Sequence, residues 1–220
     1  MAWAQIRVLK ADLFGRVEQV HLSERGPKIL AVRRDIAAAR WWVRWLARSL
    51  ARREQRALLA LDGLDAVPRA LGADRNASLR SWLEGEPMHL AQPPSIEYFA
   101  QAHRLLVQLH RRGITHNDLA KEPNWLVTPS GQPALIDFQL ASVHPRRSKL
   151  FRVKGREDLR HLLKHKRSYC PESLTDRERG ILAKKSWPSR IWMRTGKPVY
   201  LFVTRRVLGW SDREGAGDRN

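Results

Sequence analysis

The sequence predicts an α+β fold with a small antiparallel sheet, one long helix and a compact, mostly helical remainder that carries a β-hairpin. Apolar and polar side chains alternate through residues 5–34, which is typical of strands with one buried face. Apolar residues then recur at spacings of three and four through residues 36–61, which indicates an amphipathic helix. Two short apolar runs, 125–127 and 134–136, flank a turn rich in Pro and Gly and predict the hairpin.

The composition indicates a globular, strongly basic protein. With 220 residues and 43% hydrophobic residues, the chain can form one large domain or two small lobes. It has 41 Lys and Arg against 22 Asp and Glu, and the net charge of +19 implies attraction to nucleic acid, anionic lipid or phosphorylated sugar. The single cysteine, Cys170, excludes an intrachain disulfide and a cysteine-rich metal site, and indicates a reducing cytosol.

The sequence carries no signal for secretion or for a membrane span. The first residues have neither a basic n-region nor a long apolar h-region. No uncharged apolar stretch approaches the roughly 18 residues that a spanning helix needs. We therefore expect a cytoplasmic protein, soluble or peripheral on the inner face of the membrane, with a disordered tail at residues 211–220.

The alternating segment predicts three antiparallel strands, with breaks at Phe14-Gly15 and at 25–27. The following helix, with a candidate break near Trp42, has an inward face at helical spacing. This face comprises Val43, Leu46, Leu50, Glu54, Ala57 and Leu61. Glu54 is the exception among them, and a buried carboxylate needs a cation or hydrogen-bond donors.

The same helix carries arginines at a constant spacing of four, with tryptophans beside its start. They are Arg40, Arg44, Arg48, Arg52 and Arg56, with Trp41, Trp42 and Trp45. Basic residues interleaved with tryptophan suit a membrane interface or nucleic-acid phosphates. The alternative is a solvated arginine face with the tryptophans packed inward.

Short strands at 67–71 and 78–83 precede a break at 84–87, and Ser95 is a helix N-cap. The face expected to be buried on that helix contains His103 and His110, which we interpret as packing residues rather than metal ligands. This face comprises Ile96, Phe99, Ala100, His103, Leu106, Val107 and His110. Gly113 ends the helix and leads the chain to His116.

Polar residues interrupt the apolar runs between residues 114 and 140. His116, Asp118 and Asn124 precede the first hairpin strand, and Asp137 follows the second. The hairpin can therefore bring an amide and a carboxylate to one point, where hard oxygen ligands suit Mg²⁺.

The segments HNDLAKEPN and DFQ resemble the H-R-D-x-x-x-x-N and D-F-G motifs of the protein-kinase-like superfamily. The resemblance implies a two-lobed fold with ATP between the lobes. One domain at 1–210 would have its N-lobe at about 1–84 and its C-lobe at about 90–210.

By this resemblance Asp118 is the catalytic base, with His116 supporting its loop, and Asn124 and Asp137 bind Mg²⁺. Two departures stand out. Asn124 is one residue farther from Asp118 than the motif has, so the loop must bulge, with 121–123 as the candidate place. Gln139 replaces the motif's glycine and removes its freedom for positive φ.

The resemblance also implies ATP-binding residues in the N-terminal half. Gly15 is the only glycine of the turn that would cover the phosphates. Residues 82–85, with Glu84, match the hinge beside adenine.

Arg33 occupies the position of the family's phosphate-binding lysine, and its expected partner is Glu54. Lys28 and Arg34 are the alternatives for that position. Asp158, in a short helix expected at 157–163, resembles the acid that bonds the catalytic-loop backbone.

Beyond Leu140 no A-P-E motif closes an activation segment. Thr175 and Glu178 form a capping box, and residues 187–210 are ambiguous between helix and strand.

The absence of an activation segment and the short single domain resemble RIO-type and lipopolysaccharide-core sugar kinases. This resemblance implies ATP-dependent phosphorylation of a heptose or Kdo hydroxyl on a membrane-held lipid. The alternatives are a protein serine/threonine kinase and, in another class, a catalytically inactive kinase-like binding module. The expected cofactors are ATP and Mg²⁺. The expected partners are the hydroxyl acceptor and an anionic membrane surface, with nucleic acid ranked lower.

Overall fold

The computed structural model describes residues 2–23, 28–92 and 95–184. The chain divides into two compact units, Met1–Leu162 and Leu163–Asn220, and the first contains every candidate site residue discussed below. The predicted break at 25–27, the ambiguous segment 187–210 and the predicted tail at 211–220 lie outside the described residues.

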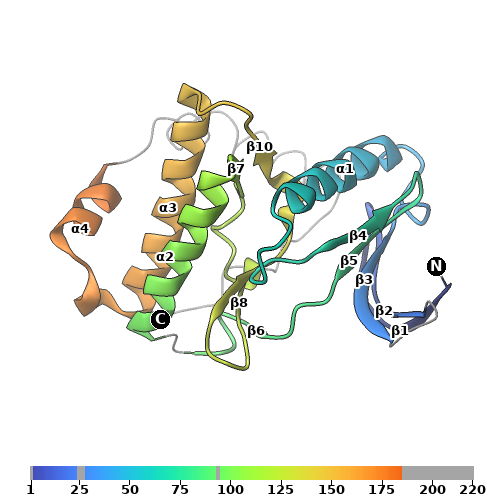
Figure 1. Ribbon diagram of the computed structural model, residues 1–220, viewed down its shortest axis with the longest axis horizontal. Coiled ribbons are helices and arrows are strands. Elements are labelled where there is room, and N and C mark those ends of the chain that lie inside the picture. Colours follow the sequence, from blue (N-terminus) through green and yellow to red (C-terminus); the bar gives the residue numbers. More distant parts are fainter. Residues whose placement is uncertain (1, 24–27, 93–94, 185–220) are drawn as a thin grey trace, which may run out of the picture. The chain divides into compact units, whose positions relative to one another are not determined.

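A five-stranded antiparallel sheet forms the N-terminal part of the first unit (Figure 1). Its order is β1 (Ala2–Asp12), β2 (Gly15–Ser23), β3 (Ile29–Asp35), β5 (Ala77–Ser81) and β4 (Ala70–Ala73). The three N-terminal strands predicted from alternation are confirmed. Their buried side chains Val20, Leu22 and Ala31 pack with Leu71 and Leu79 of the other two strands. Together with the helices below, this confirms the α+β class.

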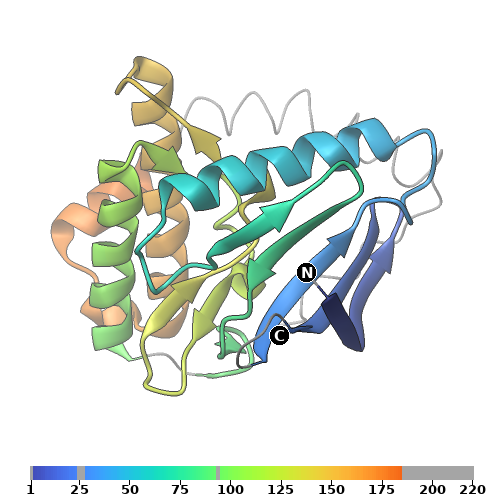
Figure 2. The same ribbon diagram turned by 45° about the vertical axis from the view of Figure 1, so that its right-hand side comes forward.

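Helix α1 (Arg44–Ala60) runs beside β4 and β5 (Figure 2). Residues 36–43, expected to be helical, form turns because other segments bind their backbone. The Ile36 amide donates to Asn76 O at 2.7 Å, and the Arg40 amide donates to Leu13 O at 3.1 Å. The tip of the β1–β2 hairpin is therefore fastened to the segment that leads into α1.

The buried face of α1 is built mainly from small residues. Its members are Ala47, Ala51, Glu54, Ala57 and Leu58. The predicted burial of Glu54 is confirmed, whereas Leu46 and Leu50 are only half-buried. Phe14 packs against Ala47 and Ala51, so the alanines allow the hairpin tip to approach the helix closely.

Helix α2 (Ile96–Arg111) begins as predicted, because Ser95 Oγ accepts the Tyr98 amide at 3.2 Å. Its predicted face is partly wrong: Ile96 is 54% exposed and His103 is also exposed. The buried residues are Tyr98, Phe99, Ala102, Leu105, Leu106 and Leu109. Tyr98 is buried although it lies outside the predicted face. Its hydroxyl donates to Leu126 O at 3.1 Å inside the core, which satisfies its polar end.

The hairpin predicted at 125–136 is present as β8 (Trp125–Val127) and β9 (Pro133–Leu135), with Trp125 paired to Leu135. Strand β6 (Glu86–Pro87) extends this sheet, and β7 (Ile114–Thr115) pairs with β10 (Ser142–Val143). The Leu135 amide donates to Ala66 O at 2.9 Å, which ties the chain after α1 to the hairpin.

Helix α3 (Lys149–Tyr169) is much longer than the short helix expected at 157–163. In the second unit, η3 (Pro171–Ser173) and α4 (Asp176–Ala183) follow. The predicted capping box is confirmed, since Thr175 Oγ1 accepts the Glu178 amide and Glu178 accepts the Thr175 amide. Among the helices of the described ranges, none is long and apolar enough to cross a membrane.

Candidate active site

The loop that carries the first polar cluster leaves strand β7 directly after helix α2. Gly113 adopts φ +74° at the end of α2, and its carbonyl accepts the His144 amide at 2.8 Å. The chain changes direction at Gly113 with a positive φ, which glycine adopts without strain. This explains why a glycine ends the helix, as predicted. The chain then enters the loop at His116.

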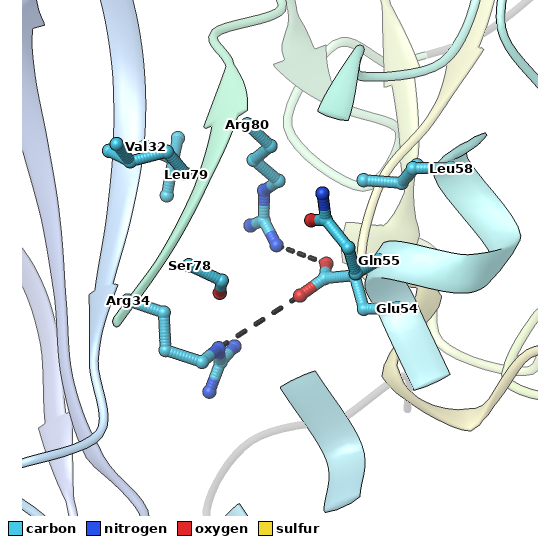
Figure 3. A pocket seen from close by; sticks show the side chains of 8 residues that line it. All are labelled: Val32, Arg34, Glu54, Gln55, Leu58, Ser78, Leu79 and Arg80. Atoms are coloured by element: carbon cyan, nitrogen blue, oxygen red, sulfur yellow. Dashed lines mark hydrogen bonds and ion pairs between the residues drawn. The ribbon is translucent and has the colours of Figure 1, made fainter. Parts of the chain in front are cut away.

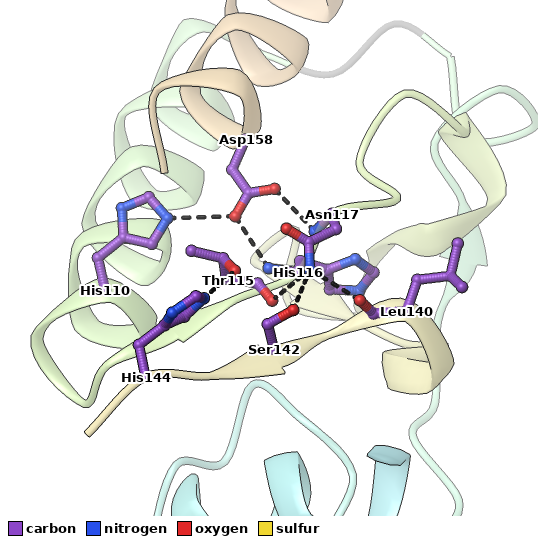
Figure 4. A network of polar contacts seen from close by, with 8 residues as sticks. All are labelled: His110, Thr115, His116, Asn117, Leu140, Ser142, His144 and Asp158. Atoms are coloured by element: carbon purple, nitrogen blue, oxygen red, sulfur yellow. Dashed lines mark hydrogen bonds and ion pairs between the residues drawn. The ribbon is translucent and has the colours of Figure 1, made fainter. Parts of the chain in front are cut away.

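Asp158 holds this loop through its backbone (Figure 4). Its fully buried carboxylate accepts the backbone amides of His116 and Asn117, each at 2.9 Å. His110 Nε2 lies 3.2 Å from the same carboxylate. The predicted bonds from Asp158 to the backbone of this loop are confirmed, whereas a catalytic role for the loop stays a prediction. Each such hydrogen bond to a charged acceptor stabilises the fold by about 1.5–3 kcal/mol.

The Asn117 side chain connects the loop to the segment after Asp137. Its amide nitrogen donates to Leu140 O at 2.7 Å and lies 3.0 Å from Ser142 Oγ. The loop that carries Asn117 and the segment after Asp137 are thus joined directly as well as through the hairpin.

His116 is fully buried and its ring packs against Phe138, with ring centroids 4.6 Å apart. Its Nε2 lies 3.0 Å from Ile136 O, and a carbonyl can only accept, so Nε2 carries the proton. Burial lowers the pKa of His116 below its ordinary value, although the charge of Asp158 opposes the shift. His116 is therefore neutral and packed inside the core, and its role in supporting the loop of Asp118 stays a prediction.

Asp118 is held at the surface of the loop by two neighbours. Asn124 Nδ2 donates to its backbone oxygen at 2.8 Å and to its Oδ2 at 3.1 Å, and Lys121 Nζ lies 3.0 Å from the same Oδ2. No described residue bonds Oδ1, and the side chain is 15% exposed. A 3-10 turn, η1 (Glu122–Asn124), lies at the place where the bulge was predicted.

Asp137 lies next to Asn124 across the hairpin. The Ile136 amide donates to Asn124 O at 3.0 Å, so Asp137 is one residue beyond that rung. It adopts φ +64° and ψ +67° and begins the 3-10 helix η2 (Phe138–Leu140). Gln139 lies inside this helix, where no positive φ is needed, and its Nε2 donates to Asp137 Oδ1 at 2.6 Å. The Gln139 side chain thus fixes the Asp137 carboxylate.

These residues can hold a hard cation. Asn124 uses its amide nitrogen for Asp118, which leaves its Oδ1 without a hydrogen-bond partner among the described residues. The same is true of Asp137 Oδ2. Mg²⁺ typically takes only one or two protein ligands, with water and phosphate oxygens completing its octahedron. Accordingly, no group of three or more His, Cys, Asp or Glu suited to a metal occurs in the described ranges.

The backbone is strained at this site. Asn117 and Asp137 are the two residues other than glycine with positive φ in the part of the chain that the structure describes. Such conformations cost about 1–3 kcal/mol each and cluster at functional sites. That both occur beside Asp118 supports the location inferred from the sequence.

Glu54 meets two arginines, but Arg33 is not one of them (Figure 3). Arg34 Nε lies 4.0 Å from Glu54 Oε2, and Arg80 of β5 donates to Oε1 in a very short contact. The three side chains are at most 15% exposed and line a cavity of about 10 Å³, roughly the space that one water requires. Arg80 was not predicted as a partner of Glu54. The available signal was its place on a strand that faces α1, two residues from Ser78.

The predicted Arg33–Glu54 pair is wrong because successive side chains of a strand point to opposite faces. Arg33 is cross-strand to Glu18, and its Nη1 lies 3.0 Å from Glu18 Oε2. On that face Arg33 also stacks on Trp3, with its guanidinium carbon 4.4 Å from the ring centroid. Arg34, one of the two alternatives from the sequence, occupies the α1 side.

Arg34 and Asp137 share one electrostatic environment. Burial lowers the pKa of Arg34, whereas the charges of Glu54 and Asp137 act in the opposite sense. Helix α1 also packs against η2, directly after Asp137. The Arg34–Glu54 pair and Asp137 of the hairpin therefore lie close enough for their charges to interact.

Two predicted residues remain, Gly15 and Glu84. Gly15 is buried at φ +117°, and a side chain there would collide with Asp35 O, so this glycine serves close packing. Glu84 is exposed in the extended linker between β5 and β6. Gly85 in that linker passes so close to Val127 that an added Cβ would lie 2.8 Å from Val127 O.

Comparisons with protein-family models and with curated protein sequences find no match for this chain.

Proposed function

We propose that this protein has a two-lobed, protein-kinase-like fold and transfers the γ-phosphoryl group of ATP to a hydroxyl. The observation that carries the proposal is the arrangement around Asp118. Asn124 donates to this carboxylate, Asp158 holds the loop backbone, and Asp137 follows one residue beyond the rung to Asn124. Phosphoryl transfer needs a hydroxyl-orienting acid beside two oxygen ligands for Mg²⁺, and the site has these parts.

Asp118 would orient the acceptor. Its Oδ2 is engaged by Asn124 and Lys121, while Oδ1 is left to accept the hydroxyl proton. The acceptor oxygen forms a bond to the γ-phosphorus as the bond between this phosphorus and the bridging oxygen of ADP breaks. The hydroxyl proton passes to Asp118 and then to solvent. Positioning and electrostatic stabilisation supply most of the acceleration in such reactions.

Asn124 Oδ1 and Asp137 Oδ2 would be the protein ligands of Mg²⁺. When bound, the ion would offset the negative charge of the phosphates. Gln139 keeps Asp137 in one orientation by its hydrogen bond to Oδ1. The ligand carboxylate is thereby ordered before the ion arrives.

Arg34, rather than Arg33, would contact the α- and β-phosphates. Arg34 and Arg80 place two guanidinium groups against the single carboxylate of Glu54, so one positive charge is left uncompensated. The buried Nε of Arg34 has no hydrogen-bond partner among the described residues. Its charge interaction with Asp137 is consistent with phosphates held between the two. The linker 82–85, with Glu84, would lie along the adenine, because Gly85 approaches strand β8 directly after Asn124.

The acceptor we favour is a core sugar of a lipopolysaccharide. The support is the net charge of +19 and the exposed tryptophans at the start of α1, which suit a protein that works at an anionic lipid surface. The protein would then act in the cytoplasm, peripheral to the inner face of the membrane. A protein serine or threonine is the other acceptor, with the same chemistry at Asp118.

One observation favours the second candidate function, an inactive kinase-like binding module. Arg34 and Arg80 both engage Glu54, and the cavity that they line holds about 10 Å³. An arginine held by Glu54 in this way would have to turn toward a nucleotide before it could contact phosphate.

The test is a transfer assay with γ-labelled ATP and Mg²⁺ on core lipid, total protein and RNA, together with calorimetric titration of ATP. We expect label on core lipid, loss of transfer in Asp118→Asn with ATP affinity retained, and weaker Mg²⁺-dependent ATP binding in Asp137→Ala. Binding of ATP without transfer to any acceptor would favour the inactive module. If the protein does not bind ATP at all, transfer to a core sugar and transfer to a protein serine or threonine are both overturned.

A further inference from the structure

A second basic site is lined by residues of α1 and of the β4–β5 turn. It is a cavity of about 210 Å³. Arg48, Arg52 and Arg56 of α1 line it together with Arg75 of the turn, and Asp74 is the one acidic residue of the lining. The arginines come from successive turns of the helix, because their spacing of four keeps them on one side.

Four of the five arginines noted in the sequence separate into two groups in the structure. Arg44 Nη2 donates to Ala37 O and Ala39 O, both at 3.1 Å, and Arg48 Nε donates to Arg75 O at 3.1 Å. These two therefore brace loops. Arg52 and Arg56 form no hydrogen bond or ion pair with any described residue.

The lining leaves most of this charge unneutralised, because Asp74 supplies one negative charge against four arginines. Asp74 Oδ1 accepts the amides of Asn76 and Ala77, at 2.6 and 2.7 Å, and so serves its own turn. Desolvation, followed by the charges of Arg75, Arg44 and Arg52, lowers the pKa of Arg48. Four guanidinium groups around one cavity repel one another, and a bound anion with several oxygens would relieve this repulsion.

Tryptophans extend the same face toward the start of the helix. Trp45 is three residues before Arg48, on the side of α1 that carries the arginines, and is 69% exposed. Trp41, in the turn before the helix, is 81% exposed. The interpretation that these tryptophans pack inward is therefore wrong. Large aromatic rings exposed beside a cationic cavity are expensive in water and favourable at the level of lipid headgroups.

We infer that this cavity binds the phosphomonoester headgroup of an anionic lipid and so docks helix α1 on a membrane surface. A phosphomonoester offers three oxygens to planar guanidinium forks, which matches a cavity lined on several sides by arginine. A nucleic-acid strand would instead need cations spread along a track with aromatic rings between them. Here the rings lie at one end, and the cations converge. This site is separate from Asp118 and does not depend on the proposed transfer reaction.

The experiment is co-sedimentation of the full chain with phosphatidylcholine vesicles that contain phosphatidic acid or phosphatidylglycerol at matched surface charge. We expect tighter binding to phosphatidic acid. Since each basic residue near an anionic surface strengthens binding about fivefold, Arg52→Gln/Arg56→Gln should bind about 30-fold more weakly. Both residues are exposed and make no contacts that hold the fold.

The matched control is Arg104→Gln/Arg111→Gln, which removes the same charge from exposed positions of α2 and should change binding less than about threefold. Asp118→Asn should bind vesicles like the wild type, so failure of the catalytic proposal would leave this test unaffected. Equal loss in the control pair, or no preference for phosphatidic acid, would overturn the headgroup cavity.

Two further arms separate the other ligands. Inorganic phosphate that binds the wild type when vesicles do not would assign the cavity to a free phosphate and overturn the membrane proposal. A fluorescent single-stranded RNA that binds in an Arg52-dependent manner, with vesicles ignored, would overturn it in favour of nucleic acid.

Discussion

Gln139 Nε2 lies 2.6 Å from Oδ1 of Asp137, and this contact orders the carboxylate that we propose as a Mg²⁺ ligand. Asp137 is held at φ +64°, a conformation that needs support from its surroundings. The residue that replaces a motif glycine therefore supplies part of that support.

Gln139→Ala should loosen Asp137 without removing it. We expect the Mg²⁺ concentration for half-maximal ATP binding to rise about three- to tenfold, because one orienting hydrogen bond contributes about 0.5–1.5 kcal/mol. Calorimetric titration at several Mg²⁺ concentrations measures this. Gln132→Ala, at an exposed position of the β8–β9 turn, is the control. A Mg²⁺ dependence equal to that of wild type would show that the Gln139 contact is incidental.

Asp158→Asn should disrupt the loop that carries Asp118. One oxygen of the new amide can still accept a backbone hydrogen, but its NH₂ group would face the second donor. We expect a loss of about 3 kcal/mol in the free energy of unfolding by urea and a tenfold or greater fall in kcat. Asp176→Asn, whose side chain is fully exposed, should change the free energy of unfolding by less than about 0.5 kcal/mol. An Asp158→Asn protein with unaltered stability would mean that the loop is held by other contacts.

His116 predicts a pH dependence of stability. Burial lowers its pKa in the folded protein, so between the unfolded pKa of about 6.5 and the lower folded value only the unfolded chain takes up this proton. The stability contributed by neutral His116 is full above pH of about 6.5 and is lost as the pH falls toward the folded value. The expected slope is up to about 1.4 kcal/mol per pH unit.

His116→Gln should remove this part of the slope, as measured by urea unfolding between pH 7.5 and 5. His103→Gln, at an exposed position of α2, should leave it intact. Identical slopes in wild type and His116→Gln would refute the buried, neutral imidazole.

Local sequence patterns predicted the parts of this fold that depend on near neighbours. Alternation predicted the N-terminal strands, and the Ser95 and Thr175 caps are confirmed because each depends on residues three positions apart. The loop around His116 was also accessible, since its motif and the acid that supports it have characteristic spacings.

Side-chain partners across the sheet were not accessible in the same way. A shift of one residue moves a strand side chain to the opposite face, and only the pairing with β2 and β5 fixes which arginine of β3 faces Glu54. The turns at 36–43 were missed for a similar reason, because their backbone partners, Leu13 and Asn76, come from segments distant in sequence.

The two neighbouring arginines of β3 allow one matched comparison. Arg34→Gln should leave Glu54 with Arg80 alone and remove the proposed phosphate contact, whereas Arg33→Gln breaks a pair with Glu18 on the other face. We expect the KM for ATP to rise more than tenfold in Arg34→Gln and less than threefold in Arg33→Gln, measured by the transfer assay. A larger rise in Arg33→Gln would return the phosphate-binding role to Arg33.

Glu54→Gln provides the stability counterpart, because it leaves Arg34 and Arg80 buried side by side without their carboxylate. Removing one partner of a buried ion pair costs about 3–5 kcal/mol, so urea unfolding should show a loss in that range. Glu97→Gln is the control, since its pair with Arg104 is more than half exposed and should contribute about 0–1 kcal/mol.

Arg34→Lys separates the two proposed functions. A lysine reaches Glu54 through one contact instead of a fork, so it is held less firmly and can turn toward phosphate. If Glu54 restrains Arg34 in an inactive module, Arg34→Lys should gain ATP binding; if Arg34 already serves phosphate, the KM for ATP should rise.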